Sequence, residues 1–126
     1  MDANALAWVL LGKLSEKLHI APEVIYQEMV RDIGGNYEVL PVRADAVERF
    51  CEAWKSNGIG WQTTTFPSKL HGYVNVMAYF GSSTYDTAQM SRLINNIIDE
   101  CHTHGVETRT PEEIESLLKM WEERAK

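Results

Sequence analysis

The stretch DTAQMSRLINNIIDEC, residues 86–101, carries the strongest fold signal in the chain. Its apolar residues recur every three or four positions, which is the spacing of one face of an α-helix. These residues are Met90, Leu93, Ile94, Ile97, Ile98 and Cys101. Asp86 or Thr87 can cap the start of such a helix, and Gly105 can end it in a left-handed conformation. The stretch therefore predicts a long helix with one buried face.

Four further segments show the same helical spacing. The first follows Asp2, a residue type favoured at N-caps, and its apolar face includes Val9. The second begins with a proline and includes Val24. The last follows Thr110 in a Thr-Pro-Glu-Glu sequence, which matches a capping box. The four predicted helices cover residues 3–18, 22–33, 44–56 and 111–121.

Three segments between these helices read as strands. The first covers residues 36–42, where Pro41 confines the strand to the edge or the end of a sheet. Residues 61–66 (WQTTTF) and 73–80 (YVNVMAYF) are rich in Thr, Val and aromatic side chains, which favour extended structure. The turn residues between them predict an antiparallel pair. The sequence thus predicts an α+β domain over residues 1–126, with about five helices packed on a small antiparallel sheet.

Composition places the chain among ordinary folded proteins. It has 126 residues, 44% of them hydrophobic and 24% charged, with a net charge of −6. Its apolar runs fall short of the ~20 residues that span a bilayer, and its start lacks the basic segment of a signal peptide. Cys51 and Cys101 are too few for a disulfide scaffold, so we expect buried thiols in a cytoplasmic protein. The acidic balance argues against a protein that grips duplex DNA through many phosphates.

Catalytic and metal-binding readings find little support in the sequence. Cys101, His102 and His104 could suggest a metal site, but the two histidines are two positions apart and do not share a helix face well, and no second CxxC or HxxxH motif supports them. Ser82 and Ser83 stand in GSSTYD, which is a polar capping loop rather than a nucleophile elbow. Carboxylates available to a metal-dependent nuclease occupy ordinary helix faces and caps; they are Glu38, Asp45, Glu48 and Asp86. We therefore expect a non-enzymatic protein without a metal site or cofactor.

Aromatic and cationic side chains point instead to surface recognition. Four tryptophans and five tyrosines are many rings for a small domain, and most should be buried. Trp61 and Tyr85 lie beside loops, so we expect them to be exposed and available for stacking on bases or on a partner. Six basic residues could form a modest positive surface that binds a ligand; the alternative is that they are simply exposed to solvent. These residues are Lys13, Lys17, Lys55, Lys69, His71 and Arg92.

Two segments resemble a known family. Asp2, Asn4 and Trp8 form a D-x-N-x-x-x-W motif that leads into the first helix. Later, Gly81-Ser82-Ser83 precedes the long helix, and His104-Gly105-Val106 precedes a helix that bears Trp121. Together they resemble the NinB/Orf family of phage recombination proteins. The segments GNYE (35–38), GWQ (60–62) and YFGSSTYDTAQMSRLI (79–94) are similar to its branch from phages and prophages of Gram-positive bacteria.

The resemblance implies a recombination mediator in the host cytoplasm. Such a protein is a homodimer that binds single-stranded DNA, associates with the single-strand-binding protein and helps to load a recombinase, without covalent chemistry. It implies DNA contacts for Trp8 and for the helix with Trp121. The chain begins at the D-x-N motif, so we expect the family's N-terminal β region to be absent.

Charge modifies what the resemblance implies. Thr84 and Asp86 stand where family members have a basic loop, so we expect DNA binding to be weak and salt-sensitive. The acidic balance also keeps an alternative open. The chain could be a phage-encoded interaction module that modulates a host factor without touching nucleic acid.

Overall fold

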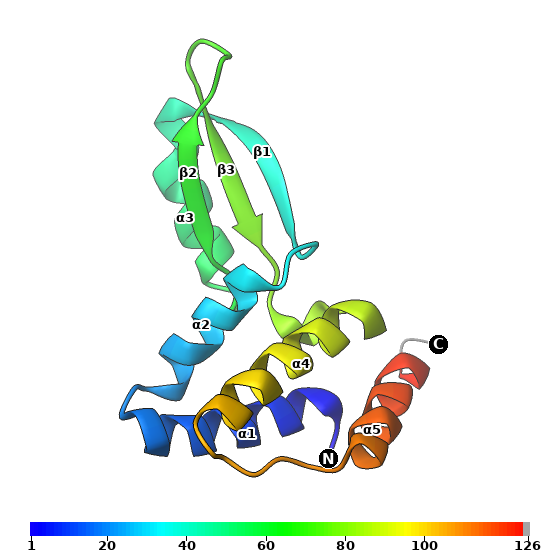
Figure 1. The fold of residues 1–126 in the computed structure, drawn as a ribbon. Coiled ribbons are helices and arrows are strands. Elements are labelled where there is room, and N and C mark those ends of the chain that lie inside the picture. The colour runs from blue at the N-terminus through cyan, green and yellow to red at the C-terminus, as the bar shows by residue number, and fades with distance from the viewer. Residues whose placement is uncertain (125–126) are drawn as a thin grey trace.

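The computed structural model describes residues 1–124 and confirms the α+β class. It contains five α-helices and a three-stranded antiparallel sheet (Figure 1). The helices are α1 (Ala3–Leu18), α2 (Pro22–Asp32), α3 (Val47–Lys55), α4 (Thr87–Thr103) and α5 (Pro111–Glu123). The strands are β1 (Tyr37–Arg43), β2 (Thr63–Pro67) and β3 (Tyr73–Tyr79). Within residues 1–124, no helix has both the length and the hydropathy needed to cross a membrane.

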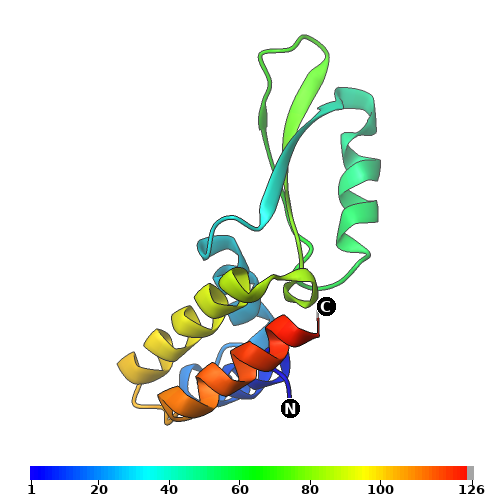
Figure 2. The same ribbon diagram turned by 90° about the vertical axis from the view of Figure 1, so that its right-hand side faces the viewer.

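Four of the helices pack mainly on one another. The apolar face of α4 lies against α1, and α2 and α5 flank this pair. The α4 residues Leu93 and Ile97 and the α1 residues Leu10 and Leu14 are all buried, which is the outcome their helical spacing predicts. The sheet, with α3 on one side, projects from this helical layer (Figures 1 and 2). The molecule therefore has a helical base and a β-sheet unit.

The predicted helix starts are confirmed at three caps. The Asp2 carboxylate accepts a hydrogen bond from the Ala5 N–H at 2.7 Å. Asp86 and Gln89 form a complete capping box at the start of α4. The Thr110 hydroxyl accepts from the N–H three residues on, at 3.2 Å, and a proline follows it. Each cap satisfies N–H groups that a helix leaves without an internal partner.

The strand order in the sheet is β1-β3-β2, so β3 is central and both other strands are edges. Pro41 pairs with Asn75 across the β1–β3 ladder, which confirms the edge position expected for this proline. The predicted antiparallel pairing of the second and third strands is also confirmed. The third helix differs from expectation, because residues 44–46 form a 3₁₀ turn and α3 begins at Val47.

Helix α3 covers one face of the sheet. Side chains alternate along a strand, so Val76 and Ala78 of β3 share a face, and both are fully buried. The indole N–H of Trp54 donates to the Tyr79 carbonyl oxygen at 2.7 Å. The Trp54 ring also makes edge contacts with the rings of Trp61 and Phe80. These contacts give the β-sheet unit a small core of its own.

Some apolar residues are less buried than the spacing predicts. Val9 and Val24 were expected on buried helix faces but are 41% and 52% exposed. α1 and α2 each bury one stripe of side chains, and Val9 and Val24 lie outside it, in solvent. Cys51 is half-buried, while Cys101 is fully buried against the α4 core.

The two parts of the molecule meet at a tightly packed junction. The Tyr26 hydroxyl donates to Ser82 Oγ at 2.7 Å, and Ser82 Oγ donates to Asn4 Oδ1 at 2.6 Å. The same tyrosine oxygen accepts the Ser82 N–H. This network ties α1 and α2 to the segment that leaves β3. Ser82 therefore has a structural role, which agrees with reading GSSTYD as a capping loop.

Glycine substitutions at the junction and in α1 should shift stability in opposite directions. A Cβ at Gly60 would lie 2.6 Å from the Tyr26 hydroxyl and 3.1 Å from the Gly81 Cα. We expect Gly60→Ala to destabilise the fold by about 1–3 kcal/mol through overpacking. In the described chain a Cβ at Gly12, inside α1, meets nothing within 4 Å. Gly12→Ala should therefore stabilise by about 0.5–1 kcal/mol, and urea unfolding of both variants tests the pair.

Candidate functional site

The ten residues predicted to bind DNA are dispersed over the molecule. Lys13 and Lys17 are exposed on α1, whereas Lys69 and His71 are exposed in the β2–β3 hairpin at the far end of the sheet. Trp8, Lys55 and Trp61 lie near the junction. The remaining three, Tyr85, Arg92 and Trp121, are engaged in packing or capping. The set therefore does not form one surface.

Tyr85 was expected to be exposed, and this expectation is wrong. Its side chain is only 3% exposed, and its hydroxyl accepts a hydrogen bond from Asn36 Nδ2 at 2.8 Å. Burial raises the pKa of the Tyr85 hydroxyl above its usual value. The 3₁₀ turn over residues 82–84 directs the ring inward before α4 begins. Tyr85 cannot stack on a base in this conformation.

Trp121 is also a core residue. Its ring is 3% exposed, and its indole N–H donates to the Tyr85 carbonyl oxygen at 2.8 Å. The Arg124 guanidinium covers the ring, 3.4 Å from its centroid, and donates to the Ser83 carbonyl oxygen at 2.7 Å. The DNA contact that the resemblance implies for Trp121 would therefore require this cover to open.

Arg92 closes the end of α2. Its Nε donates to the Ile33 carbonyl oxygen and its Nη2 to the Gly34 carbonyl oxygen, both at 3.1 Å. These two oxygens lie at a helix C-terminus, where a cation is favoured by the partial negative charge. Arg92 therefore caps the C-terminus of α2, and its guanidinium group is engaged in these two hydrogen bonds.

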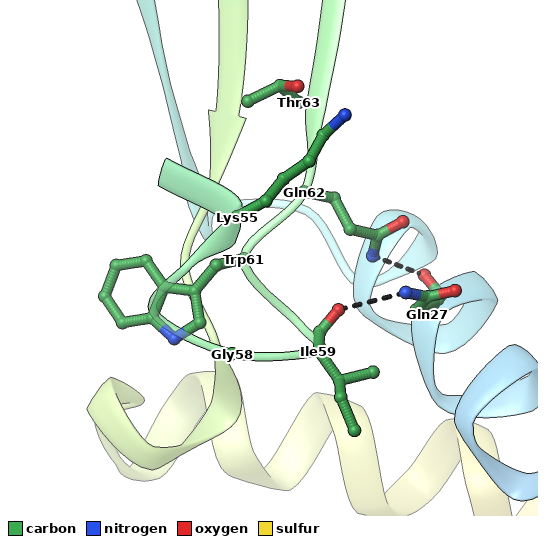
Figure 3. Close-up of a pocket in the computed structure, with 7 residues that line it drawn as sticks. All are labelled: Gln27, Lys55, Gly58, Ile59, Trp61, Gln62 and Thr63. Atoms are coloured by element: carbon green, nitrogen blue, oxygen red, sulfur yellow. Dashed lines mark hydrogen bonds between the residues drawn. The ribbon is translucent and has the colours of Figure 1, made fainter. Parts of the chain in front are cut away.

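A pocket of about 620 Å³ lies between α2, the end of α3 and the start of β2 (Figure 3). Two amide side chains shape one wall: Gln27 donates to the Ile59 carbonyl oxygen and Gln62 donates to the Gln27 carbonyl oxygen. Lys55 is the one charged residue among those that line it. The lining residues are Gln27, Lys55, Gly58, Ile59, Trp61, Gln62 and Thr63. This pocket could accept an apolar or uncharged group beside a lysine.

Trp8 and Trp61 line a second, shallower hollow of about 200 Å³. It shares Gly58, Ile59 and Trp61 with the larger pocket. Trp8 is half-buried and packs against Tyr26, with ring centroids 4.5 Å apart and ring planes tilted by 33°. Trp61 is half-buried too, since Trp54 holds one edge of its ring. The exposure expected for Trp61 is therefore only partial.

A third cavity is lined by acidic residues, unlike the two hollows at the junction. It lies between α1, α2 and α4, and acidic residues from α2 and α4 surround it. These are Glu28, Asp32, Asp99 and Glu100. A polyanion would be repelled there, so the acidic balance of the chain is concentrated away from the junction. The two hollows at the junction have no carboxylate among their lining residues.

The end of α4 does not gather metal ligands. His104 lies 3.5 Å from Glu100, one turn back on the helix, and Cys101 points into the core. Burial raises the pKa of the Cys101 thiol, which disfavours the thiolate that a metal would need. Across residues 1–124, no three His, Cys, Asp or Glu side chains lie close enough to hold an ion.

The sheet face opposite α3 carries exposed aromatic rings that the sequence reading missed. Tyr37 pairs with Tyr79, Arg43 with Tyr73 and Phe66 with Asn75, so their side chains share this open face. Tyr37, Phe66 and Tyr73 are 42%, 38% and 37% exposed. The signal was present in the alternation of 37–43 and 73–79. Which face α3 would cover could not be decided from that alternation alone.

Cations cluster at the far end of the open face. The Ala44 N–H donates to the Gly72 carbonyl oxygen at 2.9 Å, which brings the end of β1 beside the hairpin that bears Lys69 and His71. Arg43 lies at the same end, 3.0 Å from Asp45, and both side chains are well exposed. Asp45 thus offsets the Arg43 charge, and Lys69 carries the remaining positive charge at this end.

Comparison of the chain with protein-family models, with curated proteins and with solved structures found no match. The likeness to the NinB/Orf family therefore depends on the D-x-N-x-x-x-W motif and the other segments that carry it.

Proposed function

We propose that this protein is a non-enzymatic accessory factor of phage recombination that binds single-stranded DNA across the open face of its sheet. The observation that carries the proposal is that three exposed rings share one face: Phe66 and Tyr73 lie near the hairpin, and Tyr37 lies at the opposite end of β1. Unpaired bases stack on such rings with little dependence on sequence. A duplex would not use them, because its bases are already stacked.

The polar groups of the face suit the same ligand. Thr64 and Asn75 lie among the rings and can hydrogen-bond to bases or sugars. Arg43 is the one charged residue of the three strands on this face, and Lys69 and His71 lie just beyond it. Few cations mean few phosphate contacts, so binding should be weak, as the net charge of −6 also suggests, and its salt slope should amount to about 0.7 for each of these contacts.

Fluorescence polarisation of a labelled oligonucleotide tests the proposal. We expect a rise in polarisation with single-stranded DNA at low salt, a smaller rise with duplex, and a loss of affinity as salt increases. Absence of a rise at low salt, with and without single-strand-binding protein, would remove the proposal. Magnesium should cause no cleavage of the oligonucleotide.

Removal of the hairpin cation should reduce the salt dependence. Each phosphate contact to a single strand contributes about 0.7 to the slope of log affinity against log salt. We expect Lys69→Gln to lower the slope by about that amount while leaving stability unchanged, because Lys69 is exposed. Lys119→Gln, an exposed lysine on α5, is the matched control and should leave the slope as it was.

The interaction-module alternative uses the same exposed rings for a protein partner. Aromatic side chains are also enriched at protein interfaces, so the rings alone fit either ligand. Pull-down from host lysate separates the two: partners that persist after nuclease treatment, with no polarisation change on free DNA, would favour the alternative. Recovery of single-strand-binding protein together with DNA binding fits the proposed mediator.

A further inference from the structure

We propose that a second copy of this chain pairs with the outer edge of β2, so that two three-stranded sheets join into one of six strands. The two β2 strands would run antiparallel, related by a two-fold axis at Thr64. The family resemblance implies a homodimer without specifying its interface, and the inference assigns that interface to the β2 edge. The hydrogen-bond pattern of the sheet, the difference between its two edges and the chemistry of residues 62–66 carry it.

The ladder register shows which backbone groups of β2 point outward. The Tyr79 N–H donates to the Gln62 carbonyl oxygen at 2.8 Å, so Gln62 and Tyr79 form a hydrogen-bonded pair. Such pairs alternate with non-bonded ones along an antiparallel ladder. Thr64 therefore bonds to β3, while the N–H and C=O groups of Thr63 and Thr65 point away from it. In residues 1–124, these outward groups find no partner in another segment.

The opposite edge is protected, and the β2 edge is not. The Phe80 N–H donates to the Asn36 carbonyl oxygen, so by the same alternation Val39 and Pro41 turn their backbones outward on β1. Proline has no N–H, which interrupts that edge at its middle, and Arg43 adds charge at its end. On β2 the first proline is Pro67, the last residue of the strand.

The β2 edge is complementary to itself. In a two-fold pairing through Thr64, Thr63 of each copy lies opposite Thr65 of the other, and each pair exchanges two hydrogen bonds. Residues 62–66 carry no charge, so the pairing places no like charges opposite each other. An acidic or basic peptide would find no charged partner along these residues. A second copy fits this edge better for that reason.

In the same register, the hairpin of one copy would occupy the junction pocket of the other. In this pairing, a residue that follows Thr64 in one copy lies opposite the residue that precedes Thr64 by the same number of positions in the other copy. The hairpin of one copy therefore lies beside the loop 58–61 of the other. Leu70 at the hairpin is 54% exposed, and Ile59 at the pocket is 46% exposed. Contact between them would bury two apolar side chains that are exposed in the single copy. The open face would also continue from one copy to the next, with Phe66 near the seam.

A charge swap at Thr64 tests the pairing. Thr64 side chains of the two copies would lie opposite each other across a non-bonded pair, with Cα atoms about 4.5 Å apart. We expect the wild type to have about twice the 14.4 kDa chain mass by light scattering after gel filtration. Thr64→Lys and Thr64→Glu should each reduce the mass to one chain, because like charges face each other. An equimolar mixture of the two variants should restore the dimer.

Val39→Lys is the matched control, since it places the same charge on the exposed β1 edge. We expect it to remain dimeric, and circular dichroism should show all variants folded. A wild type that stays at the mass of one chain at 100 μM or more would overturn the pairing. So would a dimer that survives both Thr64 substitutions, or a mixture that fails to reassemble. The readout of this test is the mass alone, because Thr64 also lies on the face proposed to bind DNA.

Discussion

Replacing Phe66 and Tyr73 together by alanine is expected to weaken the binding of single-stranded DNA by about 30-fold or more. Stacking of a base on an aromatic ring contributes about 1–3 kcal/mol, so the loss of two rings removes two such contributions, at least about 2 kcal/mol in total. Polarisation titrations at one low salt concentration measure the effect. The salt slope should hardly change, because neither ring contacts phosphate.

We expect the chain to stay folded without these two rings. Phe66 and Tyr73 are 38% and 37% exposed and lie outside the buried core of the helical base. Tyr73→Phe keeps the ring and should bind nearly as the wild type does, which separates stacking from loss of the hydroxyl. Val24→Ala, an exposed apolar truncation on α2, should leave binding unchanged. Equal affinity of the double variant and the wild type would exclude the open face as the site.

Local signals in the sequence determined much of the fold. Asp2 and Asp86 bond to the helix starts as predicted, because an N-cap needs only residues three positions apart. Pro41 identified an edge strand, because a missing N–H is tolerated only where no neighbour needs it. These features are set within a few residues of the chain and do not depend on tertiary contacts.

The candidate site was less predictable because it depends on which element covers which face. Tyr85 next to a loop and Tyr73 next to a turn have similar local surroundings, yet the first is buried and the second exposed. Asn36, 49 positions away, bonds to the Tyr85 hydroxyl and helps to hold it inside. Tyr73 is exposed because α3 packs on the opposite face of its strand. Neither the Asn36 contact nor the position of α3 can be predicted from the residues next to each tyrosine.

The charged residues are unevenly distributed over the molecule, which the net charge does not reveal. The acidic residues around the α2–α4 cavity lie in the helical base, whereas the far end of the sheet carries Lys69 and His71. A single strand would therefore be repelled from the base and accepted at the sheet. At an ionic strength of 0.15 M the screening length is about 8 Å, so these local charges matter more than the net charge.

Replacing Trp121 by alanine should destabilise the fold by about 3–5 kcal/mol. The buried indole would leave a cavity between α5 and the start of α4, and the Tyr85 carbonyl oxygen would lose its donor. Since domains of this size are stable by only about 5–15 kcal/mol, the variant should unfold at much lower urea concentration. Trp121→Phe keeps most of the ring and should cost less, although it also loses the hydrogen bond.

Met120→Ala is the control for Trp121→Ala, because the neighbouring side chain is 53% exposed and its loss should change stability little. The two variants also separate the core role of Trp121 from the DNA contact that the family resemblance implies. If the ring only packs, the folded fraction of Trp121→Ala should bind DNA as the wild type does. A variant of unchanged stability that no longer binds DNA would instead place Trp121 at the DNA surface, and would require the Arg124 side chain to move off the ring in the complex.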